Sequence, residues 1–79
     1  MSKVLIYSTP TCTYCNMAKD FFKKNSVAYS EFNVGSDAAK RAEMVEKSGQ
    51  MGVPVIDIDG QVVVGFDQKT IASLLKLKA

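Results

Sequence analysis

Two cysteines separated by two residues are the only cysteines in this 79-residue chain, which contains no histidine. Cys12 and Cys15 follow an apolar run and precede a pattern typical of a helix. Residues three apart on a helix share a face, with Cβ atoms about 5 to 6 Å apart, so a disulfide is within reach. Such a short loop would restrict the unfolded chain very little, which makes a purely structural role a poor explanation. The spacing favours thiol–disulfide exchange.

The place of Cys12 at the start of the expected helix favours its reactive form. There the backbone N–H groups of Thr13, Tyr14 and Cys15 have no intrahelical acceptor, and together with the helix dipole they favour a thiolate over a thiol. We expect Cys15, deeper in the helix among apolar residues, to be less exposed and less acidic. The Cys12 thiolate would attack a substrate disulfide, and Cys15 or an external thiol would resolve the mixed disulfide.

Other chemistries fit these residues less well. A structural zinc site usually has four ligands, and two thiolates without a histidine supply too few, so we predict no metal site. A Cys–His hydrolase is excluded because no histidine can act as the base. Two inert buried cysteines remain the alternative to redox chemistry.

A proline near the middle of the chain is the second candidate feature. Pro54 opens the apolar segment of "GVPVIDIDG", and proline in a sheet is confined largely to strand starts and edges. A strand-start proline is the plain interpretation, but beside an upstream Cys-x-x-Cys we favour a cis Val53–Pro54 bond. A cis bond would turn the backbone of Val53 outward, where it could pair with an extended thiol peptide as an added strand.

Hydrophobic patterning predicts one α/β domain over residues 1–79 with the order β-α-β-α-β-β-α. The first βαβ unit implies a parallel crossover, and Asp59–Gly60 predicts a hairpin that adds an antiparallel pair. The expected strands cover residues 3–8, 27–34, 53–58 and 61–66, and the expected helices cover residues 12–24, 38–48 and 67–78.

The helices carry their own signals. In the second, Ala38, Ala42 and Val45 are expected to form the buried stripe, and Gly49 is the expected C-cap. In the third, an apolar stripe reaches Lys78, and Asp67 marks the N-terminus.

Composition excludes several classes of function. The formal charge is +2 with scattered lysines, which argues against nucleic-acid and membrane binding. No apolar run approaches the roughly 18 residues that span a bilayer, and no signal peptide is recognisable. We therefore expect a cytoplasmic protein.

Three motifs together, "TPTCTYC", "GVPVIDIDG" and "VVVGFD", resemble those of glutaredoxins, and the resemblance covers essentially the whole chain. It implies a thioredoxin fold with a four-stranded mixed sheet, three helices and a cis proline at Pro54. It also implies a monomer that binds no cofactor for catalysis and uses glutathione as co-substrate and electron donor. Its partners would be glutathione and disulfide-containing or glutathionylated proteins.

The resemblance also implies roles for single residues. Cys12 matches the nucleophile, Cys15 the resolving cysteine, and Tyr14 an aromatic residue that borders the thiol groove. A plain surface aromatic remains the alternative for Tyr14.

Glutathione itself would be held by residues from three segments. The Val53 backbone before Pro54 would bind its cysteinyl part, and Phe66 with Asp67 would hold its γ-glutamyl end. Arg41 matches a side chain that contacts the glycine carboxylate. Asp67 as a plain N-cap and Arg41 as a solvated helix charge remain open alternatives.

Two residues depart from the family pattern. Thr9 stands where a lysine or arginine is common, and Thr13 stands where a proline is common. The "GF" of "VVVGFD" also resembles the NrdH-redoxin branch, which implies thioredoxin reductase as an alternative donor. A third possibility is a [2Fe–2S] cluster shared by two chains, each giving Cys12, with two glutathione thiolates.

Overall fold

The structure is a computed structural model that describes residues 3–76 of the chain. Its elements follow the predicted order. They are β1 (Val4–Ser8), α1 (Thr13–Lys24), β2 (Ser30–Asn33), α2 (Ala38–Ser48), β3 (Val55–Ile58), β4 (Gln61–Val64) and α3 (Gln68–Leu74).

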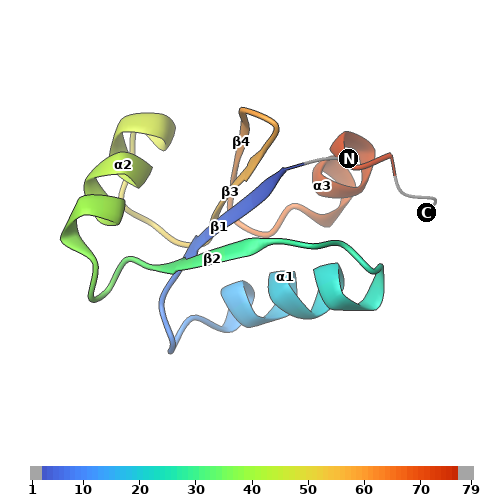
Figure 1. The fold of residues 1–79 in the computed structure, drawn as a ribbon, viewed down its shortest axis with the longest axis horizontal. Coiled ribbons are helices and arrows are strands. Elements are labelled where there is room, and N and C mark those ends of the chain that lie inside the picture. The colour runs from blue at the N-terminus through green and yellow to red at the C-terminus, as the bar shows by residue number, and fades with distance from the viewer. Residues whose placement is uncertain (1–2, 77–79) are drawn as a thin grey trace.

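The four strands form one mixed sheet in the order β2-β1-β3-β4 (Figure 1). β1 pairs in parallel with β2, whereas β3 runs antiparallel to both β1 and β4. A strand at the centre of a sheet covered on both sides needs apolar residues on both faces. β1 meets this requirement, because Ile6 and Tyr7 point to opposite faces and are both fully buried. The arrangement is the thioredoxin fold that the resemblance implies.

The two faces of the sheet have separate cores (Figure 1). α1 and α3 cover one face, where Ile6, Phe22 and Ile71 belong to one apolar cluster. α2 covers the other face, where Tyr7 and Met44 belong to a second cluster. Alternate residues of each strand therefore contribute to different cores, as the pleat of a strand requires.

The predicted hairpin joins β3 to β4 through Asp59 and Gly60. Both residues have positive φ, 52° and 90°, as a two-residue type I′ turn requires. The turn sets the register that pairs Ile58 with Gln61 and Val55 with Val64. The start of β3 and the end of β4 consequently lie at the same end of the sheet.

All four strands are shorter than the sequence pattern indicates, and the causes are clear for β2 and β4. β2 begins at Ser30 because the preceding segment ends α1: the N–H of Val27 donates to the carbonyl of Phe22 at 2.8 Å. β4 ends at Val64 because Gly65 adopts a φ of 82° and turns the chain. Lys78, expected in the last helix, lies outside the described residues.

The expected buried stripe of α2 is wrong for Ala38 and Ala42, whereas Val45 packs against the core. Met44 is its buried residue, whereas Ala38 and Ala42 are exposed and Val45 is half-buried. Glu43 and Lys47 also face the sheet, since both contact the buried Tyr7. Polar residues thus form part of the face of α2 that packs on the sheet, which apolar periodicity alone did not predict. Gly49 is the C-cap as predicted, with a φ of 72°.

Within residues 3–76, no helix has the length and apolar character needed to cross a bilayer.

Candidate functional site

The two cysteines lie at the start of α1, where Cys12 is the N-cap residue. Its Sγ accepts a hydrogen bond from the backbone N–H of Cys15 at 3.1 Å. The two residues form a disulfide, and their Cα atoms are 5.2 Å apart. Cys12 was expected in the first turn of the helix; it lies one residue outside the turn and caps it. A cap side chain faces the unpaired N–H groups of the first turn.

The surroundings of the two sulfurs differ. Cys12 is partly exposed, whereas Cys15 is fully buried, as the sequence predicts. Among the described residues, the backbone N–H groups of Thr13 and Tyr14 have no acceptor. Unpaired donors at a helix N-terminus stabilise a neighbouring anion. The geometry therefore favours a thiolate at Cys12 and shields Cys15 from solvent.

The other candidate segments reach the same end of the sheet. Ser8 ends β1 just before the cysteine loop and lies opposite Asn33 at the end of β2. Tyr7 lies opposite Val55, so Pro54 is level with the end of β1. Strand register thus brings the segments around residues 9–15, 34–41, 50–54 and 65–68 to one end of the molecule.

The segment before β3 presents free backbone groups. The Val53–Pro54 peptide bond is cis, and Pro54 is buried while Val53 is half-buried. The carbonyl of Pro54 accepts a hydrogen bond from the N–H of Gly65 at 2.8 Å. Neither the N–H nor the C=O of Val53 has a hydrogen-bond partner within residues 3–76. An unpaired N–H and C=O on one residue can pair with an extended peptide.

Asp67 caps α3, as its position in the sequence suggests. One carboxylate oxygen accepts the backbone N–H of Thr70 at 3.2 Å, and the other accepts the Thr70 hydroxyl at 2.7 Å. The hydroxyl contact, followed by the backbone contact, lowers the pKa of Asp67. Asp67 is exposed, so it presents a fixed negative charge at this end of the molecule.

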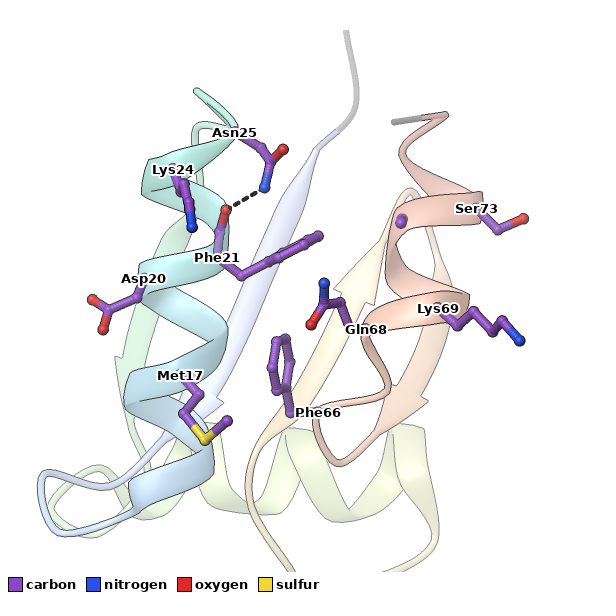
Figure 2. A pocket seen from close by; sticks show the side chains of 10 residues that line it. Met17, Asp20, Phe21, Lys24, Asn25, Phe66, Gln68, Lys69 and Ser73 are labelled. Atoms are coloured by element: carbon purple, nitrogen blue, oxygen red, sulfur yellow. Dashed lines mark hydrogen bonds between the residues drawn. The ribbon is translucent and has the colours of Figure 1, made fainter. Parts of the chain in front are cut away.

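Phe66 lies in a groove between α1 and α3 (Figure 2). Its ring packs edge-on against Phe21, with centroids 5.8 Å apart. The groove has a volume of about 1080 Å³, and Met17 lines it two residues beyond Cys15. Met17 is 46% exposed. Met17, Phe21 and Phe66 thus form the aromatic and apolar part of the groove between the two helices.

Tyr14 and Arg41 lie on different helices near this end of the sheet. Tyr14 is 63% exposed in the first turn of α1, so its ring is accessible beside the cysteine pair. Arg41 lies on α2, and its guanidinium donates to the carbonyl of Val34 at 3.4 Å. This single bond leaves most of the guanidinium donors of Arg41 available.

Sequence reasoning missed a partly buried polar network on the α2 face. Lys47 donates to Asp57 at 2.7 Å and to the hydroxyl of Tyr7 at 2.8 Å, while Tyr7 donates to Glu43. Burial raises the pKa of Tyr7, and its hydrogen bond to Glu43 raises it further. Burial opposes the charge of Lys47, but hydrogen bonds to Asp57 and Tyr7 outweigh it and raise its pKa. The sequence signal for this network was Asp57, a charged residue within the apolar run "VIDI".

Within residues 3–76, no group of three or more acidic or cysteine side chains could hold a metal ion.

A comparison with known families identifies the chain. The glutaredoxin family model matches residues 4–63, which include both cysteines and Pro54. The chain belongs to the glutaredoxin family. Phe66 and Asp67 lie beyond the matched range, so their part in the site depends on the structure.

Individual relatives agree with this assignment. A glutaredoxin-like 8.6 kDa protein from the rubredoxin operon of Clostridium pasteurianum is 42% identical over 73 residues, covering 92% of this chain and 97% of that protein. Glutaredoxin 3 of Escherichia coli is 42% identical over 67 residues, covering 85% of this chain and 81% of that protein. A point variant of the thioredoxin-like protein BC3987 superposes with a TM-score of 0.91 at 38% identity, covering 99% of this chain and all of that one.

Membership of this family and the cysteine pair make the protein a thiol–disulfide oxidoreductase. Two departures from the glutaredoxin pattern are visible in the structure. Thr9, which replaces a common cation, contributes its carbonyl as acceptor for the N–H of Cys12 at 3.2 Å. Thr13, which replaces a common proline, keeps an N–H at the first helical position.

Proposed function

We propose that the protein is a dithiol glutaredoxin that reduces glutathione mixed disulfides and protein disulfides with electrons from glutathione. The observation that carries the proposal is the asymmetry of the cysteine pair. Cys12 is partly exposed beside unpaired helix N–H groups, whereas Cys15 is fully buried behind it. The accessible sulfur is suited to attack a substrate, and the buried one to act only within the protein.

In the first step the Cys12 thiolate attacks one sulfur of the substrate disulfide. A mixed disulfide forms between Cys12 and that sulfur, and the other sulfur leaves as a thiolate that takes a proton from solvent. Unpaired N–H groups of α1 favour the attacking anion beforehand.

The mixed disulfide has two fates. In the dithiol route Cys15 loses its proton and attacks Cys12 Sγ, which releases the second substrate thiol and leaves the Cys12–Cys15 disulfide. Two glutathione molecules then reduce this disulfide and are themselves oxidised to glutathione disulfide. In the monothiol route, a glutathione held on Cys12 is removed directly by a second glutathione. Both routes balance two electrons and need no bound cofactor.

The backbone of Val53 is suited to bind the cysteinyl residue of glutathione. Its N–H and C=O lack partners within residues 3–76, and strand register places Pro54 level with the end of β1, from which the cysteine loop departs. A tripeptide paired with Val53 as an added strand would have its own sulfur directed toward Cys12. Tyr14, exposed beside Cys12, would border the bound tripeptide.

The two ends of glutathione differ in charge and would meet different residues. Asp67 carries a negative charge suited to the γ-glutamyl ammonium, and Phe66 fixes the segment that carries Asp67 through its contact with Phe21. The available donors of Arg41 are suited to the glycine carboxylate.

A coupled assay tests the electron donor. A glutathionylated peptide is supplied with glutathione, glutathione reductase and NADPH, and NADPH consumption is followed. In a parallel reaction thioredoxin reductase replaces both glutathione and glutathione reductase. We expect turnover in the glutathione reaction that is lost in Cys12→Ser.

The outcomes separate the alternatives. Turnover only in the reaction with thioredoxin reductase would mean that this reductase, as in the NrdH-redoxin branch, supplies the electrons in place of glutathione. A purified protein that is brown, dimeric and inactive in both reactions would point to a shared iron–sulfur cluster.

A further inference from the structure

A cluster of three polar side chains lies between α1 and the edge of the sheet. Lys19 Nζ forms an ion pair with Glu31 Oε2 at 2.7 Å. The hydroxyl of Ser8 donates to the same oxygen at 3.1 Å. Ser8 is 1% exposed, and the Lys19 side chain is 17% exposed. The contact to Lys19 is the main cause that lowers the pKa of Glu31, so Glu31 carries its negative charge at neutral pH.

Cys15 lies next to this cluster. Cys15 and Lys19 are four residues apart on α1, which places their Cβ atoms about 6 Å apart on one face. Ser8 ends β1 at the same end of the sheet at which α1 begins, and Glu31 lies opposite Ile6 on β2. Lys19 therefore lies on the same face of α1 as the fully buried Cys15 and pairs across to β2.

Other charged groups on this side of the sheet are more distant from Cys15. Lys23 lies one turn beyond Lys19 and also acts on Glu31, and Asp20 and Lys24 face the groove toward α3. β3 and β4 contribute apolar residues to this core. The only charged residue of these two strands, Asp57, pairs with Lys47 of α2 on the opposite face.

We propose that the Lys19–Glu31 ion pair sets the reactivity of the resolving cysteine. Lys19 favours the thiolate of Cys15, and Glu31 limits that effect while holding the ammonium in place. Lys19 and Glu31 are positioning residues that act through Cys15 and do not touch the substrate. The proposal depends on the roles of Cys12 and Cys15 in the proposed function, but not on glutathione as the donor.

Because Lys19 is positive and Glu31 is negative, removing one charge or the other should change the rate of the resolving step in opposite directions. The resolving step converts Cys15–SH to a thiolate, which attacks Cys12 Sγ and expels the bound thiol. Taking the Cβ separation of about 6 Å as the scale of the distance between charge and sulfur, and an effective dielectric constant of about 20, a unit charge changes the thiolate fraction roughly 100-fold. A more stable thiolate is also a weaker nucleophile, which cancels nearly half of this effect on a logarithmic scale. The net change in rate is about tenfold in each direction.

Stopped-flow reaction of the reduced protein with dithiobis(nitrobenzoate) tests the proposal without glutathione. Attack by Cys12 releases one coloured nitrothiobenzoate, and attack by Cys15 on the resulting mixed disulfide releases a second. At neutral pH we expect Lys19→Met to slow the second phase about tenfold and Glu31→Gln to accelerate it by a similar factor. The first phase should be unchanged in both variants.

Three further variants serve as controls. Lys19→Arg keeps the charge and should restore the parent rate, and the double variant Lys19→Met/Glu31→Gln should fall near the parent. Lys40→Met removes a cation on the opposite, α2 side of the sheet and should alter neither phase. If Lys19→Met does not fold, as judged by circular dichroism, Glu31→Gln still tests the predicted direction of the change in the second-phase rate.

A purely structural ion pair would give a different pattern. Both single variants would then shift the second phase in the same direction, or leave it unchanged, and either result overturns the proposal. An equal change in the first phase would also overturn it, because the effect would then lie on Cys12. Absence of glutathione turnover in the coupled assay would reject the proposed donor while leaving these two phases measurable.

Discussion

The sulfur of Cys12 accepts the backbone N–H of Cys15 at 3.1 Å, so the proposed nucleophile is also the N-cap of the helix that carries its partner. One side chain thus stabilises the first turn of α1 and is held by that turn close to its unpaired N–H groups. Chemistry and helix stability are coupled at this residue, and substitutions can separate them.

Replacing Cys12 by serine or by alanine should distinguish the two roles. A serine oxygen can still accept the N–H of Cys15, whereas alanine cannot, and loss of an N-cap costs about 1 kcal/mol. Under reducing conditions we expect Cys12→Ala to lower the free energy of unfolding by about 1 kcal/mol relative to Cys12→Ser. Urea unfolding measures this difference, while both variants should have no turnover. Equal stability of the two variants would show that the cap contributes nothing.

Asp67 allows a similar separation of binding from capping. Asp67→Asn keeps an oxygen for the N–H of Thr70 but removes the charge, whereas Asp67→Ala removes both. We expect Asp67→Asn to raise the KM for glutathione about tenfold, as expected for a lost charge-assisted hydrogen bond, with kcat little changed. Asp67→Ala should raise the KM to a similar degree and also unfold at a lower urea concentration. An unchanged KM in both would mean that Asp67 is a cap alone.

The network on the α2 face should govern stability more than turnover. Asp57 is nearly buried, so Lys47→Met leaves a carboxylate without its cation. Breaking a buried ion pair costs about 3 to 5 kcal/mol, and we expect about 2 kcal/mol because Lys47 is partly exposed. Lys40→Met, which removes the more exposed pair with Glu43 at 3.5 Å, should cost less than about 1 kcal/mol. Urea unfolding at pH 7 compares the two variants. Equal losses of unfolding free energy would contradict a larger contribution from the Lys47–Asp57 pair than from the Lys40–Glu43 pair.

The same variant predicts a dependence on pH. The pKa of Lys47 is raised above its ordinary 10.5 by its hydrogen bonds to Asp57 and Tyr7, against the effect of burial. A raised pKa means that this stabilisation is complete below about pH 10.5 and is lost as the pH rises through the folded-state pKa. The difference in unfolding free energy between the parent and Lys47→Met should therefore be constant from pH 6 to 9 and narrow by pH 11. A difference that stays constant to pH 11 would contradict this.

The sequence was most informative where one local signal had one structural consequence. The apolar run of β1, the Asp59–Gly60 turn, the Gly49 C-cap and the Asp67 N-cap each follow from the chemistry of one or a few neighbouring residues. The sequence also predicted that Cys12 would be the more accessible sulfur, because Cys15 lies deeper in the helix among apolar residues. The family resemblance added the fold as a whole.

Features that depend on contacts between distant residues could not be predicted in this way. The buried face of α2 includes Glu43 and Lys47 because Tyr7 and Asp57, far away in sequence, supply their partners. The groove that exposes Met17 depends on how α3 packs beside α1. The pairing of Lys19 with Glu31 likewise requires the parallel crossover to be in place. Hydrophobic periodicity describes a single helix or strand and carries no information about contacts between elements.

The most direct test of the proposed mechanism compares Cys12→Ser and Cys15→Ser on a glutathionylated peptide with glutathione as the sole reductant. Cys15→Ser keeps the accessible thiol and should sustain turnover, because an external glutathione can replace the resolving cysteine. Cys12→Ser leaves only the buried thiol and should be inactive. Sustained turnover in Cys12→Ser would contradict the assignment of Cys12 as the nucleophile. Complete loss of turnover in Cys15→Ser would contradict resolution of the mixed disulfide by an external glutathione and make the dithiol route obligatory.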